Sequence, residues 1–128
     1  MYGGIDYGVK NNKPGVQTFN PLPGTLTEAE KISDMFSKNL PATAIQVKTG
    51  LTATENSIKA FSGNSPAVIH LATHGFYMPS GNDDGERAGD PLLRCGLVFA
   101  GANSNNTVNE NEGLLTGYEI AQLDLRSV

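Results

Sequence analysis

The chain has 128 residues, of which 38% are hydrophobic and 17% are charged, and this size suits one small domain with a moderate core. The net charge is −4 and the sequence has no basic run, which argues against nucleic acid or an anionic membrane surface as a direct partner. No apolar stretch approaches the roughly 20 residues that a membrane span needs.

Cysteine usage and the N-terminal sequence predict the compartment. Cys95 is the only cysteine and cannot form an internal disulfide, which favours a reducing environment. Residues 1–7 have neither the basic flank nor the apolar core of a signal peptide. We therefore expect a soluble, cytoplasmic protein.

Short apolar segments alternate with helix signals along residues 1–128, which we interpret as one domain. In chain order the predicted elements are a strand (4–7), a helix (28–39), a strand (44–47), a helix that starts after residue 52 and ends near residue 61, a strand (67–72), a loop (79–91), a strand (97–100), a loop (102–113) and a helix (117–124). Strands that alternate with helices are joined by right-handed crossovers. The sequence thus predicts an α/β fold with a mostly parallel sheet and helices on both faces.

Each predicted helix begins with the capping-box pattern, a Thr followed three residues later by a Glu. The three pairs are Thr27 with Glu30, Thr52 with Glu55, and Thr116 with Glu119. In this pattern the Thr hydroxyl accepts a hydrogen bond from a first-turn N–H, and the Glu carboxylate accepts one from the backbone N–H of the Thr. The pattern predicts where the three helices start.

The most informative segment is 68–75, an apolar, β-branched stretch that ends in His74 and Gly75. Ligands of open α/β sheets bind beyond the carboxyl ends of the strands, where side chains meet solvent on a rigid base. An imidazole titrates near neutral pH, so His74 in this place is a candidate general base. A structural histidine bonded to loop backbone is the alternative interpretation.

We expect the second histidine, His70, to take part in neither catalysis nor metal binding. His70 lies inside the predicted strand, where we expect a buried imidazole satisfied by one or two hydrogen bonds. Four strand residues separate His70 from His74 by roughly 13 Å, too far for a shared metal ion. We expect no metal and no cofactor.

Cys95 is a weak candidate nucleophile. Arg94 beside it would favour the thiolate form, but Cys95 precedes an apolar strand, where a thiol more often packs as a small hydrophobe.

Two loop patterns suggest ligands but lack their defining residues. With Gly85 at position six of a calcium loop, position twelve is Pro91 rather than Glu. Residues 22–25 precede a helix but lack the Lys and the glycine spacing of a phosphate-binding loop. Six acidic residues in the two long loops leave a weak preference for a cationic substrate side chain; they are Asp83, Asp84, Glu86, Asp90, Glu110 and Glu112.

Five motifs come in the order seen in CHAT domains, and the chain resembles that family. They are Leu-Pro-Gly at 22–24 leading to Ala-Glu at 29–30, Thr-Gly at 49–50 before Ala-Thr-Glu at 53–55, His-Leu-Ala-Thr-His-Gly at 70–75, Gly-Leu-Val-Phe-Ala-Gly-Ala-Asn at 96–103, and Gly-Leu-Leu-Thr-Gly-Tyr-Glu-Ile at 113–120. CHAT domains are caspase-like domains usually attached to tetratricopeptide repeats in bacteria. The resemblance implies a caspase-like fold in which His74 is the catalytic imidazole and the N–H of Gly75 is an oxyanion-hole donor.

The chain departs from the family pattern at its C-terminal end. In the family the segment after the third helix leads into a strand that ends in the nucleophilic cysteine, whereas this sequence stops at 123–128. We therefore expect an inactive N-terminal part of a cysteine endopeptidase, whose parent hydrolyses peptide bonds in protein substrates with a Cys-His dyad. With the strands in the order second, first, third, segment 67–72 becomes an exposed edge that favours self-association.

Two other functions stay open. One is a parent without the cysteine, a non-catalytic scaffold that transmits binding by the attached repeats, and the other is a domain that binds a small ligand. The next ~15 residues of the parent discriminate between them, because a peptidase needs an apolar strand that ends in Ala-Cys.

Overall fold

The computed structural model describes residues 1–10, 12, 14–79, 89–104 and 113–126. Its elements are β1 (Tyr2–Ile5), α1 (Gly24–Asn39), β2 (Lys48–Gly50), α2 (Glu55–Lys59), β3 (Gly75–Tyr77), the 3-10 helix η2 (Pro91–Leu93), β4 (Cys95–Val98), β5 (Leu114–Thr116) and α3 (Gly117–Ala121). The mixture of helices and strands confirms the α/β prediction. None of the described helices is long and apolar enough to cross a membrane.

Parallel pairing involves the first three extended segments. β1 pairs with β2 in parallel. On its other side, Tyr2 N–H donates to the His70 carbonyl at 2.9 Å, and Ala72 N–H donates to the Tyr2 carbonyl at 3.0 Å. The predicted strand 67–72 is thus extended chain held to β1 by one parallel bridge at Leu71 rather than a regular strand. The spatial order second, first, third is the predicted one.

The prediction of one mostly parallel sheet is wrong for the described residues, because β3, β4 and β5 form a separate antiparallel sheet. Strands need a long crossover, usually a helix, to run parallel. Between β3 and β4 the structure describes only the single turn of η2, and the chain returns beside β3 in the opposite direction.

The predictions of capping boxes at Thr27 and Thr52 are also wrong. α1 begins at Gly24, so Thr27 lies inside its first turn, and the N-cap residue Pro23 makes no side-chain hydrogen bond. α2 is capped by Thr54, whose hydroxyl accepts from Ser57 N–H at 3.2 Å. The hydroxyl of Thr52 instead donates to the Thr49 carbonyl at 2.7 Å, within the turn after β2.

The third capping box is confirmed. Thr116 Oγ1 accepts from Glu119 N–H at 3.2 Å, and Glu119 Oε2 accepts from Thr116 N–H at 2.9 Å. This reciprocal pair satisfies two backbone donors where β5 passes directly into α3.

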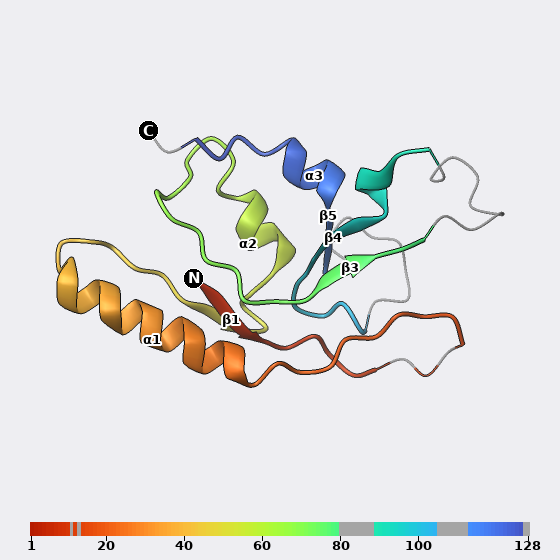
Figure 1. The fold of residues 1–128 in the computed structure, drawn as a ribbon, viewed down its shortest axis with the longest axis horizontal. Helices are drawn as coiled ribbons and strands as arrows, with labels where there is room; N and C mark the ends of the chain where they lie inside the picture. The colour runs from red at the N-terminus through yellow and green to blue at the C-terminus, as the bar shows by residue number, and fades with distance from the viewer. Residues whose placement is uncertain (11, 13, 80–88, 105–112, 127–128) are drawn as a thin grey trace.

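The helices lie on both sides of β1, with α1 on one side and α2 and α3 on the other (Figure 1). α1 approaches β1 so closely that a Cβ atom on Gly3 would lie 2.2 Å from the Thr25 carbonyl oxygen. The largest side chains that are completely buried are Tyr2, Phe99, Leu115 and Val98. They join β1 to the antiparallel sheet in one hydrophobic cluster. In this cluster the rings of Tyr2 and Phe99 pack edge to face, with their centroids 6.0 Å apart.

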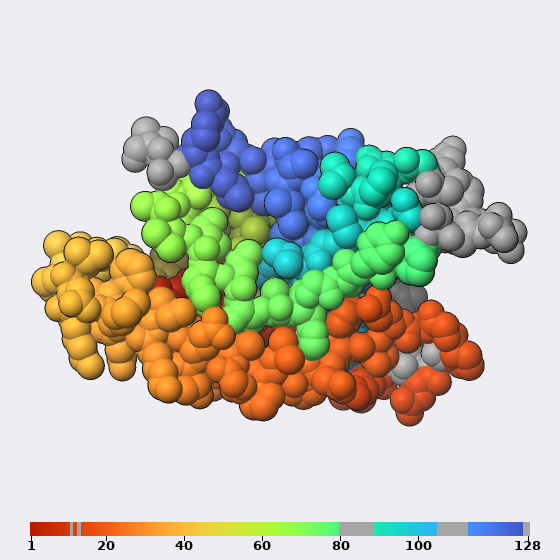
Figure 2. Space-filling model, in the orientation of Figure 1, coloured from red at the N-terminus to blue at the C-terminus, as the bar shows by residue number. Residues whose placement is uncertain are grey.

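One edge of the parallel segments has no partner among the described residues. His70 and Ala72 turn their peptide groups toward Tyr2, so the N–H and C=O of Leu71 between them point away from β1. Segment 67–77, green in the colour bar, lies at the molecular surface between α1 and the C-terminal elements (Figure 2). Val68 at the start of this edge is 59% exposed.

We predict that this edge pairs with a second copy of the chain, because unpaired backbone groups beside apolar side chains recruit other strands. The sedimentation coefficient should rise with protein concentration, and Val68→Lys should abolish the rise by placing a charge on the edge. Leu51→Lys is the matched control, because Leu51 is 69% exposed in the turn after β2. A monomer at every concentration, or an equal effect of both substitutions, would contradict the prediction.

Candidate active site around His74

The backbone around His74 is fixed from two directions. His74 immediately precedes β3, and its carbonyl accepts from Val98 N–H of β4 at 3.0 Å. The Thr73 hydroxyl donates to the Val98 carbonyl at 2.5 Å and accepts from the Tyr7 hydroxyl at 2.9 Å. Tyr7 lies two residues after the end of β1, so His74 lies where the parallel segments meet the antiparallel sheet.

The imidazole of His74 is held by two aromatic rings and one carbonyl. The ring centroids of Tyr7 and Phe19 lie 5.2 Å and 5.6 Å from that of His74. His74 Nε2 lies 2.8 Å from the backbone oxygen of Asn20. Since a carbonyl only accepts, we assign the proton to Nε2, and the neutral imidazole then carries its lone pair on Nδ1.

The N–H of Gly75 points away from β4. The hydrogen bonds Val98 N–H to His74 O and Met78 N–H to Arg94 O set the alternation of this antiparallel ladder. Gly75 faces Leu97 at a position between those hydrogen-bonded pairs, and Gly75 is exposed. The site therefore combines a base nitrogen on His74 with an adjacent backbone donor, which suits proton transfer and stabilisation of a negative oxygen.

The prediction that His70 is buried is wrong. Its side chain is 30% exposed, and Nε2 lies 2.9 Å from Glu28 Oε1 of α1. In this short extended segment the side chain reaches the helix surface rather than the core. Among the described residues, no three His, Cys, Asp or Glu side chains lie close enough to hold a metal ion.

Cys95 does not lie beside His74. It is the first residue of β4, three residues before the Val98 that bonds to His74, which corresponds to roughly 10 Å along the strand. A Cβ atom on Gly117 would lie 3.2 Å from Cys95 Sγ, so the thiol packs against the start of α3.

We predict that Cys95 behaves as an ordinary thiol. Iodoacetamide should alkylate it no faster than it alkylates glutathione, and His74→Ala should leave the rate unchanged, because no described contact connects the two side chains. The rates can be followed by mass spectrometry across a pH series. Fast alkylation that slows in the His74→Ala variant would place Cys95 in the site.

Most of the acidic residues considered for a cationic substrate (Asp83, Asp84, Glu86, Glu110 and Glu112), and Gly85 of the rejected calcium loop, lie outside the described residues. Asp90 is described, and its carboxylate accepts from Leu92 N–H at 2.9 Å as the cap of η2. Asp90 therefore has a local structural role.

An ionic cluster in which Lys59 and Glu119 surround the buried Glu55 was not predicted. Lys59 Nζ lies 2.5 Å from Glu55 Oε1 and 2.7 Å from Glu119 Oε1, and Glu55 Oε2 also accepts from Gly113 N–H at 3.2 Å. Glu55 is only 3% exposed, and this burial raises its pKa despite the contact with Lys59. The pKa of Lys59 is raised, because its bonds to the two carboxylates outweigh the opposing effect of burial. This cluster ties α2 to the start of β5 and α3.

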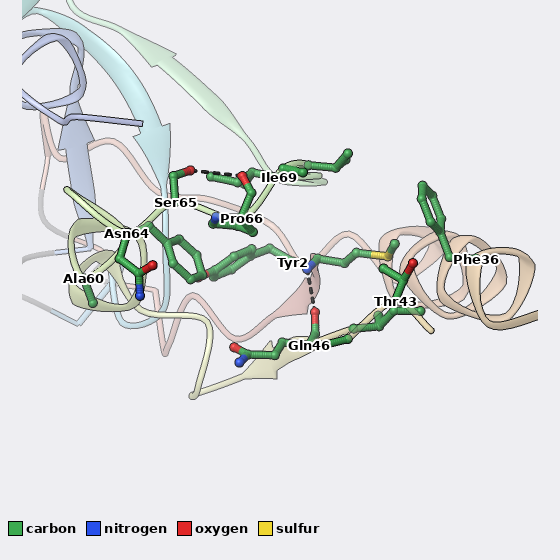
Figure 3. Close-up of a pocket in the computed structure, with 15 residues that line it drawn as sticks. Tyr2, Phe36, Thr43, Gln46, Ala60, Asn64, Ser65, Pro66 and Ile69 are labelled. Carbon is green, nitrogen blue, oxygen red and sulfur yellow. Dashed lines mark hydrogen bonds between the residues drawn. The ribbon is translucent and has the colours of Figure 1, made fainter. Parts of the chain in front are cut away.

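A cavity of about 490 Å³ lies at the amino ends of the parallel segments (Figure 3), and His74 is not among its lining residues. Tyr2, Gln46, Pro66 and Ile69 are among its lining residues, and the Met1 amino group donates to the Gln46 carbonyl at 2.6 Å. None of its described lining residues is a His, a Cys or an acid. The cavity is therefore separate from the candidate site.

Taken together, these features define a mixed α/β domain with an imidazole held where its parallel segments end. The family model of the CHAT domain matches residues 9–128, and the chain belongs to the CHAT domain family, a peptidase-related family. No curated protein and no solved structure matches the chain.

Proposed function

We propose that this CHAT domain is the N-terminal part of a caspase-like cysteine endopeptidase domain, with His74 as the catalytic imidazole and Gly75 as an oxyanion-hole donor. The nucleophilic cysteine is supplied by a strand that follows residue 128, and the substrate is a protein. The anchored imidazole at the end of an extended segment with a free edge is the observation that carries this proposal.

The course of the chain after α3 supports a strand at that edge. Gly63 N–H donates to the Asp124 carbonyl at 2.9 Å, and Asp124 N–H donates to Ser62 Oγ at 3.0 Å. These bonds bring residue 124 back to the turn before segment 67–72. A strand that continues from there alongside Leu71 runs parallel to the segment and ends beside His74, which completes a caspase-like sheet.

The reaction follows from the groups at the site. The cysteine thiolate attacks the carbonyl carbon of the scissile peptide bond, and the Gly75 N–H stabilises the oxyanion that forms. The imidazolium of His74 donates its Nδ1 proton to the leaving amine, which breaks the C–N bond and leaves a thioester. His74 Nδ1 then takes a proton from water while the hydroxide adds to the thioester carbonyl. The C–S bond breaks, the carboxylic acid leaves, and the thiolate and imidazolium are restored.

The test uses the chain extended through the next strand. A peptidyl acyloxymethyl ketone, which alkylates the thiolate of cysteine peptidases, should label one cysteine in that strand, and replacing that cysteine by Ala should abolish both labelling and cleavage of a protein partner. Cys95→Ser is the matched control and should change neither. Absence of a cysteine in the following strand would instead favour a non-catalytic scaffold.

A further inference from the structure

Asn103 is a buried amide that the peptidase chemistry does not use. It follows β4 in the turn 99–104, and only 4% of its surface is exposed. Burying such an amide costs free energy unless its polar atoms are hydrogen-bonded.

The side chain of Asn103 makes three hydrogen bonds to one distant segment. Its Oδ1 accepts from Phe19 N–H at 2.7 Å, and its Nδ2 donates to the carbonyls of Phe19 at 2.8 Å and Gly8 at 3.1 Å. Its backbone N–H donates to the Tyr7 carbonyl at 2.7 Å. No other neutral side chain of this size offers an acceptor and two donors at once.

The segment that Asn103 holds is the one that surrounds His74. Tyr7 and Phe19 supply the two rings beside the imidazole, and Asn20, whose carbonyl accepts from Nε2, follows Phe19 directly. Both backbone groups of Phe19 are bonded to the amide, so the orientation of the Phe19–Asn20 peptide depends on it. The Asn20 carbonyl belongs to the following Asn20–Pro21 peptide, so the route from Asn103 to the imidazole passes through two consecutive peptide units.

We infer that Asn103 is a positioning residue for His74: by holding Phe19, it aims the Asn20 carbonyl at Nε2 and keeps Nδ1 as the base nitrogen. This role rests on the proposed function only for its catalytic consequence, because the tautomer of His74 exists without a substrate. Loss of the amide frees the Asn20 carbonyl to turn, and the imidazole then populates both tautomers.

The experiment is long-range ¹H–¹⁵N NMR of the two histidines in the neutral form. In the unmodified chain His74 should show a single tautomer protonated at Nε2, and in the Asn103→Ala variant it should show a mixture. His70 is the internal control, because its Nε2 is held by Glu28 far from Asn103 in sequence, and its signals should not change. Asn103→Asp is the second variant, which keeps the size and the acceptor while removing both donors.

The outcomes separate the two proposals. A predominant Nδ1–H form in the unmodified chain, or an unchanged tautomer in either folded variant, overturns the role of Asn103. In the extended chain Asn103→Ala should lower kcat about 10- to 100-fold with KM unchanged and should shift the pH profile, as expected for a misdirected general base. A tautomer that depends on Asn103 in a chain with no peptidase activity would leave this inference standing and end the proposed function.

Discussion

The His74→Ala variant of the chain extended through the next strand is expected to lose about 10³- to 10⁴-fold in kcat/KM toward a protein substrate. The loss should appear in kcat, because the imidazole transfers a proton only in the transition state. The fold should survive, since His74 is partly exposed and its side-chain hydrogen bond goes to a surface carbonyl. Cleavage is measured by the appearance of new N-termini in a partner protein.

Two matched variants isolate the chemistry from the fold. His70→Ala removes a histidine of the same segment that is paired with Glu28, and it should leave kcat unchanged. Gly75→Ala keeps the backbone N–H, and the added Cβ would meet only the Gly96 carbonyl at an ordinary 3.6 Å, so this variant should keep its turnover. Full activity of the His74→Ala variant would end the assignment of the catalytic imidazole.

Lys59→Met is expected to cost ~2–3 kcal/mol of unfolding free energy, which is below the 3–5 kcal/mol typical of breaking a buried ion pair because Lys59 is 27% exposed. The substitution leaves the carboxylate of Glu55 buried without its ammonium partner. Urea unfolding measures the change. Lys31→Met, at an exposed position of α1, is the control and should lie within about 0.5 kcal/mol of the unmodified chain.

The pH dependence of this cost has a definite sign. Glu55 has a raised pKa from burial, and loss of Lys59 raises it further, so stability of the variant falls as pH rises through that pKa. In the unmodified chain burial would raise the pKa of Glu119, but hydrogen bonds from Lys59 and Thr116 outweigh burial and lower it. The ionised Glu119 carboxylate therefore contributes to the stability of the fold, and this contribution is lost as pH falls through its pKa. The difference in unfolding free energy between the Lys59→Met variant and the unmodified chain should therefore become smaller from pH 7 to pH 5. A difference that does not change with pH would argue against the ionic cluster.

Local patterns predicted the elements better than the contacts between them. The Thr116 cap followed from a spacing of three residues, whereas the order of the first three extended segments was a hypothesis about the fold that no local pattern dictated. The same spacing failed at Thr27 and Thr52, because Pro23 starts α1 earlier and Thr52 bonds within a turn. The antiparallel return of β4 could not be predicted from alternation, which carries no information on strand direction.

The candidate site was predicted only at its centre. His74 and Gly75 stand out because a histidine followed by a glycine ends an apolar run. Tyr7, Phe19 and Asn20 approach His74 from 54 or more residues away along the chain, and no short spacing relates them to it. Asn103 lies within a motif of the CHAT resemblance, which was the one available signal, but its partners required the structure.

The hydrogen bonds of Asn103 join residues 84 to 96 positions apart, since its side chain bonds to Phe19 and Gly8 and its backbone N–H bonds to Tyr7. Closing such long loops is costly in chain entropy and is slow in small domains. During synthesis, the imidazole of His74 therefore emerges from the ribosome well before the amide that orients its surroundings. We therefore expect the hydrogen bonds that hold the surroundings of His74 to be among the last parts of this domain to form.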